Sequence, residues 1–446
     1  MRSRRFVPLF ATQLFNAFND NLYKTAMVLF VVYSIYNDEA AEGIFSAVAS
    51  ALFILPFFLL SALAGQLADM RDKAAIVRKV KACEILLMLI GATGLLLEWK
   101  GYDLPASIPL GFMTIETSWP IVLMLFALFL TGVQSTFLGP IKYAILPQHL
   151  HKDEVLAGTG WVEAGTYIAI LAGTILAGWI PVEVAAVAII GVSIAGYFTS
   201  RSIPDAPPQA PDEKLDWHLI RASYTLVRNT MADARVYYAI LAISFFWTIG
   251  AVLFIQFPPL AKNVLMASKE VASLFLVIFS VGVAIGSVSI NALLKGTVSA
   301  RFAPPAVIAM GLFVATFYLV CRAWAADVDP TRLMNVSEFI AYPLAELLLF
   351  NLLLIAIAGG IFVVPLYAFL TTKVAAGQAA RTIAANNIVN SFAMVVGSLL
   401  AMGLSAVGVP IVEQLLLSAA MCLVSAWLGW LLFRAECNHP DAALVD

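Results

Sequence analysis

Four polar side chains follow one face of the first apolar segment of the chain. Gln13, Asn16, Asp20 and Lys24 are spaced by three, four and four residues, which places them on one side of a helix. Asp20 and Lys24 can pair across one helical turn, which lowers the cost of burying either charge. In a bilayer such a stripe has to face the protein interior or water, because ionisable groups in hydrocarbon are costly. The stripe is a candidate site for a charged ligand, and a buried pair that fixes helix packing is the alternative.

Other polar residues interrupt later apolar segments. In the first half they are Gln134, Lys142 and Glu163, and in the second half they are mainly the neutral amides Gln256, Asn386, Asn387 and Asn390. Lys142 is either a ligand for an anion or an end-of-helix lysine that reaches for water. Neutral amides of this kind bind ligands or join helices to one another. All seven residues are candidates for substrate binding.

The composition requires contact with lipid. Of 446 residues, 61% are hydrophobic and only 12% are charged, whereas a soluble globular protein carries roughly 25% charged residues. The chain has no phosphate-binding loop of the G-x-x-x-x-G-K-[ST] type, and no cluster of His or Cys with metal-ligand spacing. The sequence therefore predicts a protein that is not an enzyme, needs no cofactor or metal and has no nucleic-acid partner.

The apolar segments predict an all-α integral membrane protein with twelve transmembrane helices in two six-helix bundles. A helix needs about 20 apolar residues to cross a bilayer. Segments of that length lie near 7–36, 44–68, 80–97, 119–141, 155–180, 182–200, 236–260, 271–294, 303–325, 341–370, 382–405 and 409–433. The predicted domains are 1–200, a linker at 201–235, a second bundle at 236–434 and a tail at 435–446. The Gly282-x-x-x-Gly286 pattern predicts close helix packing.

Basic residues predict the orientation. Most of the 26 Lys and Arg, with Lys81 counted among them, fall near one set of helix ends, which places both termini in the cytoplasm. The linker begins with several prolines, which favour a stiff spacer. Apolar residues then recur at helical spacing with arginines between them, from Leu215 to Met231. This pattern predicts an amphipathic helix that lies on the cytoplasmic leaflet, packs on the ends of the bundle, or does both.

The loop after the second segment reads GQLADMRDKAAIV, from Gly65 to Val77. It resembles the loop signature of the major facilitator superfamily, although Met70 and Asp72 depart from that pattern. The resemblance implies two six-helix bundles and alternating access. A carboxylate and cations at helix ends interact with the helix dipoles, so Gly65, Asp69, Arg71 and Lys73 are expected to act as a conformational latch.

A closer resemblance rests on FNAFNDNLYKTA, GVQSTFLGPIKYAILPQHL, WVEAGTYIAILAGT and IAANNIVNS. These segments are similar to the lysophospholipid transporter family, and especially to the transporter domain that some bacteria fuse to an acyltransferase and an acyl-carrier-protein ligase. The resemblance implies flipping of lysophospholipids, chiefly lysophosphatidylethanolamine, from the outer to the inner leaflet of a bacterial cytoplasmic membrane. The acyltransferase that remodels the lipid would be a separate chain, and membrane lipids would be the other partners.

The resemblance also implies roles for single residues. Asp20, Lys142 and Glu163 correspond to the family's intramembrane aspartate, lysine and glutamate. The family's arginine in the seventh segment is absent, with Phe254 at about its place and Gln256 nearby. We expect Asp20 to meet the ammonium group of the lipid, and Lys24 or Lys142 its phosphate. Two alternatives are a proton-coupled transporter of another small amphipathic solute and a membrane module that docks an acyltransferase.

Overall fold

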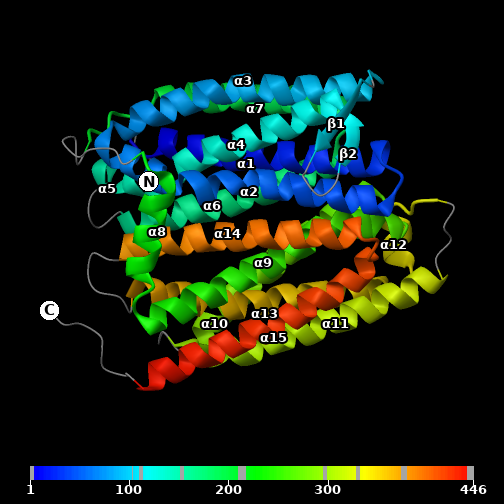
Figure 1. Cartoon of the computed structure of the whole chain (residues 1–446). Coiled ribbons are helices and arrows are strands. Elements are labelled where there is room, and N and C mark those ends of the chain that lie inside the picture. The colour runs from blue at the N-terminus through cyan, green and yellow to red at the C-terminus, as the bar shows by residue number, and fades with distance from the viewer. Residues whose placement is uncertain are drawn as a thin grey trace. The chain divides into compact units, whose positions relative to one another are not determined.

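The computed structural model describes residues 5–102, 104–109, 114–150, 155–208, 217–294, 299–327, 332–372 and 379–438, and they are almost entirely helical (Figure 1). The elements are α1 (Val7–Phe30), the π-helix η1 (Val31–Ile35), α2 (Glu39–Met70), α3 (Lys73–Trp99), β1 (Pro105–Pro109), β2 (Thr114–Ser118), α4 (Trp119–Ala144), α5 (Leu146–His149), α6 (Val155–Trp179), α7 (Val182–Arg201), α8 (Leu219–Thr230), α9 (Ala234–Asn263), α10 (Lys269–Leu294), the 3-10 helix η2 (Ala300–Phe302), α11 (Ala303–Asp327), α12 (Val336–Ala341), α13 (Ala345–Thr372), α14 (Ala379–Ala406) and α15 (Ile411–Asn438).

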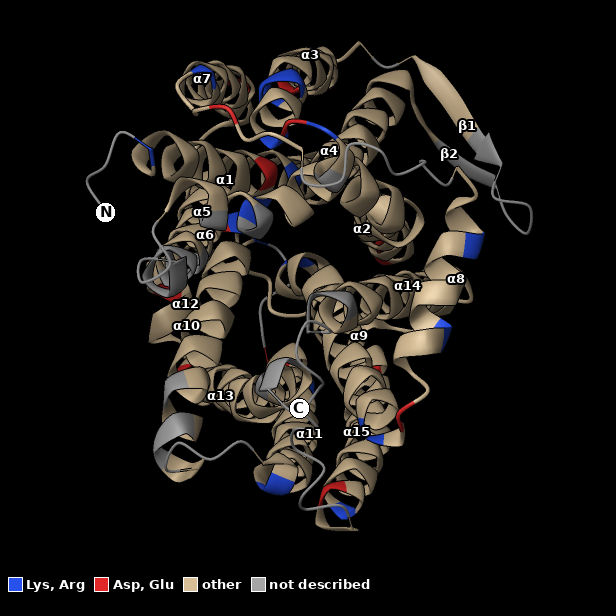
Figure 2. Ribbon diagram, turned by 90° about the vertical axis from the view of Figure 1, so that its left-hand side faces the viewer, with Lys and Arg blue, Asp and Glu red and all other residues tan. Residues whose placement is uncertain are grey.

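The helices confirm a multi-pass membrane fold. Among the described residues, ten helices are long and apolar enough to cross a bilayer. The helices α1, with 24 residues, and α6, with 25, are not among these ten but have the length of a span. Figure 2 shows that coloured charged residues are sparse along the helices of each bundle.

Prolines lie inside several of the long helices. Pro56, Pro140 and Pro365 lie inside α2, α4 and α13, and α9 contains the pair Pro258 and Pro259. A proline inside a membrane helix is tolerated when neighbouring groups satisfy the freed backbone carbonyls. These positions are therefore places where a membrane helix can bend.

A short β-hairpin interrupts the helices between α3 and α4. The strands β1 and β2 pair antiparallel, with Pro105 opposite Ser118 and Pro109 opposite Thr114. The sequence analysis did not predict this hairpin, because its strands are short and contain two prolines, which are unfavourable in strands. The otherwise all-α prediction of the fold class holds.

The chain forms two compact units. Unit 1 contains residues 1–30 and 55–219, and unit 2 contains residues 31–54 and 220–446. The division inside α2 falls next to Pro56, so the first half of this helix belongs to unit 2 and the second half to unit 1. The π-helix η1 also belongs to unit 2, although it continues directly from α1.

The two units repeat one pattern of helix packing. In unit 1, α1 packs against α6 and α7, and α3 packs against α4 and α7. In unit 2, α9 packs against α14 and α15, and α11 packs against α13 and α15. The order of the helices along the chain is the same in both sets. The two units are therefore structural repeats within one chain, an arrangement that many membrane transporters share.

The segment that follows α7 is packed against unit 1. Asp72 caps the N-terminus of α3 by accepting from the backbone N–H of Ala75 at 2.8 Å, and it also accepts from the N–H of Ala206 at 3.0 Å. Arg78 forms an ion pair with Asp205 at 2.6 Å. Ile203 is buried in the same apolar cluster. The proline-containing segment thus begins as part of unit 1, and Asp72, a departure from the family's loop pattern, anchors it.

Candidate functional site

The polar stripe on α1 lies against α3 and α4. Asp20 is buried, while Gln13, Asn16 and Lys24 are partly buried. Asn16 Nδ2 donates to Asp20 Oδ2 at 3.1 Å, which links two members of the stripe along the helix. Lys24 lies close enough to Asp20 for electrostatic attraction between them. Asn16 and Asp20 therefore face the interior of unit 1, as their spacing predicted.

A buried ion pair on α3 forms the centre of this site. Lys81 and Glu84 bond to each other across one helical turn, and both side chains are fully buried. The sequence analysis counted Lys81 among the basic residues near the cytoplasmic helix ends and did not consider Glu84. Lys81 lies two turns inside α3, because this helix begins at Lys73. Glu84 could have been recognised from the sequence, because it is a carboxylate inside an apolar segment, next to Cys83.

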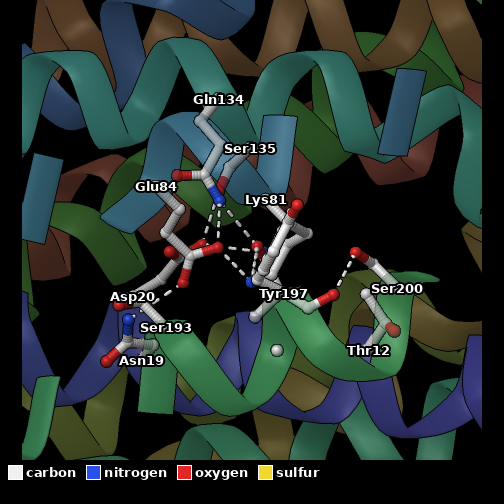
Figure 3. Close-up of polar contacts among 12 residues, drawn as sticks. Thr12, Asn19, Asp20, Lys81, Glu84, Gln134, Ser135, Ser193, Tyr197 and Ser200 are labelled. Atoms are coloured by element: carbon white, nitrogen blue, oxygen red, sulfur yellow. Dashed lines mark hydrogen bonds and ion pairs between the residues drawn. The ribbon is translucent and has the colours of Figure 1, made fainter. Parts of the chain in front are cut away.

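Side-chain amides from two other helices surround the ion pair (Figure 3). Asn19 Nδ2 on α1 donates to Glu84 Oε1 at 2.9 Å. Gln134 Nε2 on α4 donates to Glu84 Oε2 at 2.9 Å and to Asn16 Oδ1 at 2.8 Å. Lys81 Nζ donates to the same Asn16 oxygen at 3.3 Å. Both oxygens of Glu84 thus have partners, as a buried charge requires.

Asp20 differs from Glu84, because one of its oxygens has a partner and the other does not. Its Oδ2 accepts from Asn16 and from the hydroxyl of Ser135. Its buried Oδ1 accepts no hydrogen bond from any described residue, and neither do Asn19 Oδ1 and Gln134 Oε1. All three atoms are acceptors. The network can therefore accept further hydrogen bonds from a donor such as an ammonium group.

A glycine on α7 leaves room for the side chain of Lys81. A Cβ at Gly196 would lie 2.8 Å from Lys81 Cε, so only glycine lets the lysine side chain pass along α7. The next turn of α7 bonds to α1 through the hydroxyls of Thr12 and Thr199, which lie 2.9 Å apart. The helices α1, α3, α4 and α7 thus hold the network from several sides (Figure 3).

The remaining candidates of unit 1 are only partly described. Lys142 is partly buried in the last turn of α4. The side chains of Glu163 on α6 and Asp69 on α2 lie outside the described residues. Of the predicted latch, Gly65 lies in α2 with open space where a Cβ would be, Arg71 is exposed, and Lys73 is buried at the start of α3.

The amides of unit 2 mainly join helices to one another. Gln256 Nε2 on α9 donates to Gln414 Oε1 on α15 at 3.2 Å. Asn390 on α14 accepts from the hydroxyl of Ser244 at 2.6 Å. Its amide also donates to the hydroxyl of Tyr367 at 3.3 Å. Asn386 is fully buried and Asn387 is exposed, so these neighbours on α14 do not share an environment.

Aromatic rings occupy the region of α9 around Phe254, the place where the resemblance implies an arginine. The ring of Phe254 packs edge-on against Phe279 of α10, with 4.8 Å between the ring centroids. Phe257, one turn further along α9, contacts Phe254, Phe275 and Phe279. Gln256 is buried and bonded to Gln414, and its neutral amide supplies no positive charge here. Unit 2 is apolar at this place.

Comparisons with known proteins agree with this arrangement. A lysophospholipid transporter (LplT) of Serratia proteamaculans is 26% identical to this chain over 423 residues, which cover 92% of this chain and 89% of the relative. The lysophospholipid transporter LplT of Citrobacter koseri is also 26% identical, over 431 residues that cover 92% of this chain and 91% of the relative.

Solved structures show the same fold at low sequence identity. A bacterial homologue of the human lysosomal transporter Spinster matches with a TM-score of 0.69 and 11% identity, over 100% of this chain and 99% of that one. A D-xylose–proton symporter matches with a TM-score of 0.65 and 11% identity, over 95% and 96% of the two chains. Residues 9–342, about three quarters of the sequence, match the model of the Major Facilitator Superfamily. The chain is therefore a multi-pass membrane transporter that belongs to the Major Facilitator Superfamily.

Proposed function

We propose that this transporter carries lysophospholipids, chiefly lysophosphatidylethanolamine, from the outer to the inner leaflet of a bacterial cytoplasmic membrane. The observation that carries the proposal is the similarity to lysophospholipid transporters, which extends over 92% of the chain. A zwitterionic lipid with one acyl tail needs polar groups for its head and apolar surface for its tail. The charged network of unit 1 and the aromatic cluster of unit 2 support that division of roles.

Asp20 is the proposed partner of the lipid's ammonium group. The free Oδ1 offers a charged acceptor, and hydrogen bonds to charged groups are the stronger kind. Glu84 is not available for this role, because Lys81, Asn19 and Gln134 already occupy its oxygens. The network thus contains two buried carboxylates, of which one is structural and the other is proposed to bind the ligand.

Lys24 and Lys142 are the proposed partners of the lipid's phosphate. Both side chains are partly buried. Lys81 is less suitable, because moving it toward a phosphate would leave Glu84 as an unpaired buried charge. Gln13, Asn16 and Glu163 complete the proposed site in unit 1. Gln256, Asn386, Asn387 and Asn390 in unit 2 are proposed to act mainly by holding the helices that border the substrate path.

The direction of transport and the orientation in the membrane are part of the same proposal. The bias of basic residues supports cytoplasmic termini. Transport needs no energy source if a separate acyltransferase consumes the lipid on the cytoplasmic side. Alternating access would then proceed by movement of the two units, with Gly65, Asp69, Arg71 and Lys73 as the cytoplasmic latch.

Transfer of labelled lysophosphatidylethanolamine across the bilayer of proteoliposomes tests the proposal. We expect wild type to flip the lipid with or without a pH gradient, and Asp20→Asn to lose this activity. Asn229→Gln on α8 is the matched control, because its side chain is exposed and the change keeps an amide. A strict requirement for the gradient would favour a proton-coupled transporter of another solute. Absence of flipping by the folded wild type would favour the acyltransferase-docking module and refute the proposal.

A further inference from the structure

The helix α8 has an apolar face that is exposed among the described residues. Ile220 is 79% exposed and Tyr224, one turn later, is 61% exposed, and Trp217 just before the helix is 72% exposed. Ser223, on a different face of the helix, is buried. The predicted helix is thus confirmed here, and Leu219, Ala222 and Leu226 on its other side are partly buried.

Two arginines border this face. Arg221 and Arg228 are both exposed, and neither forms an ion pair with another described residue. At about 100° per residue, they lie on the same side of the helix, next to Ile220 and Tyr224. Figure 2 shows blue, basic segments along α8. Further around the helix lie the exposed residues Thr225 and Asn229. The exposed surface of α8 therefore changes around the helix from apolar to basic and then to neutral polar.

The position of α8 in unit 2 fixes the level at which this face lies. Only three residues lie between Thr230 and Ala234, where the membrane-spanning helix α9 begins. Asp233 caps α9 and is paired with Arg235 at 2.9 Å. In Figure 1, α8 runs crosswise to α9 and α15 at the end where α9 starts. A helix in this position lies along the membrane boundary, because the spans cross the bilayer.

We propose that α8 rests on the membrane surface and binds anionic phospholipid head groups, with Trp217, Ile220 and Tyr224 inserted at the level of the head groups and Arg221 and Arg228 on lipid phosphates. Tryptophan, tyrosine and arginine are the residues that anchor proteins at this level of a bilayer. The charge of the unpaired arginines is complementary to that of anionic lipids. This role does not depend on which solute the transporter carries.

Fluorescent labels on the two faces test where α8 lies. The full-length chain would have its two exposed cysteines, Cys83 and Cys437, replaced by serine, and would carry either Tyr224→Cys or the control Asn229→Cys. In nanodiscs that contain phosphatidylglycerol, we expect a nitroxide on the lipid head group to quench the label at position 224, and aqueous iodide to quench the label at 229. Iodide quenching at both positions would overturn the proposal. Protection of position 224 only after addition of a cytosolic protein fraction would also overturn it, in favour of a protein partner.

Charge variants test the preference for anionic lipid. Removing both arginines in Arg221→Gln/Arg228→Gln is expected to weaken the affinity of α8 for the anionic surface by about 30-fold, which corresponds to ~1 kcal/mol for each arginine. Arg221→Lys/Arg228→Lys should restore the lipid quenching, and the exposed Arg201→Gln on α7 should leave it unchanged. Equal quenching of the wild-type helix in nanodiscs with and without phosphatidylglycerol would contradict recognition of anionic head groups.

Discussion

The two units share a pattern of helix packing but differ in the chemistry of their interiors. Among the described residues, unit 1 buries Asp20, Lys73, Lys81 and Glu84, whereas Glu42 is the one buried acidic or basic side chain of unit 2. The interior of unit 2 uses neutral contacts such as Ser244 with Asn390, together with stacked aromatic rings. One arrangement of helices thus supports a charged interior in unit 1 and a mainly neutral interior in unit 2.

The difference supports the separate tasks that we propose for the two units. Burying charges is costly unless each has partners. In unit 1, amides from α1 and α4 donate hydrogen bonds to the buried ion pair and so offset this cost. Asp20, the incompletely paired carboxylate beside that pair, is the group that we propose a ligand completes. Unit 2 avoids the cost and offers apolar surface, which suits an acyl tail. Recognition of the charged head would then belong mainly to unit 1.

Glu42, the single buried acidic residue among the described residues of unit 2, binds side chains of α9, one of which holds backbone carbonyls in place. Glu42 accepts from Lys262 Nζ and from Asn263 Nδ2, each at 2.5 Å. The same Lys262 nitrogen donates to the carbonyls of Val32 and Tyr36, each at 2.7 Å, at the end of the π-helix η1. This pair therefore fastens residues 31–54 to α9.

The largest effect on stability is expected in the network of unit 1. Glu84→Leu leaves Lys81 buried without its carboxylate, which should cost about 3–5 kcal/mol of unfolding free energy. The double variant Lys81→Met/Glu84→Leu should recover much of that loss, because no unpaired charge remains. Denaturant unfolding in detergent micelles measures both variants. Equal stability of the single and double variants would show that the charges are not coupled.

A smaller loss is expected for the ion pair of unit 2. Glu42→Leu should cost roughly 1.5–3 kcal/mol, the range for hydrogen bonds to charged groups, because Lys262 keeps two carbonyl partners. The same unfolding experiment compares it with Glu84→Leu. If the loss at Glu42 were the greater one, the contrast between the two interiors would not hold.

Close helix packing should matter about as much as the second ion pair. A Cβ at Gly286 on α10 would overlap the carbonyl oxygen of Ile357 on α13, and one at Gly282 would lie 2.5 Å from the Cβ of Ala356. These contacts confirm the expected role of the glycine pair. Gly286→Ala should destabilise the fold by about 1–3 kcal/mol. Gly403→Ala is the matched control, because open space surrounds that position.

The smallest effect is expected for a neutral contact of unit 2. Ser244→Ala removes one hydrogen bond to Asn390, which still donates to Tyr367. The expected loss is about 1 kcal/mol, with transport nearly unchanged. The unfolding midpoint and the flipping assay check the two parts of this prediction. A loss of transport at normal stability would instead place the amide cluster of unit 2 on the substrate path.

The sequence was sufficient to predict the membrane fold, the facing of Asn16 and Asp20, and the amphipathic helix. Each of these depends on periodicity along one segment. The contacts of Glu84 with Asn19 and Gln134 join three helices that are distant in the chain, so no local pattern reveals them. Lys81 was misplaced because a lysine near a predicted helix end resembles one that reaches for water, whereas α3 extends beyond its apolar run. The hairpin and the anchoring role of Asp72 likewise depend on tertiary packing.

The most direct measurement is the affinity of wild type and Asp20→Asn for two lysophospholipids that differ only in the head group. Lysophosphatidylethanolamine carries an ammonium group and lysophosphatidylglycerol does not. If Asp20 accepts from the ammonium group, the substitution should weaken binding of the first lipid by about 10- to 150-fold, the equivalent of roughly 1.5–3 kcal/mol for a hydrogen bond to a charged group, and change binding of the second far less. An equal loss for both lipids, or none for either, would contradict recognition of the charged head by unit 1.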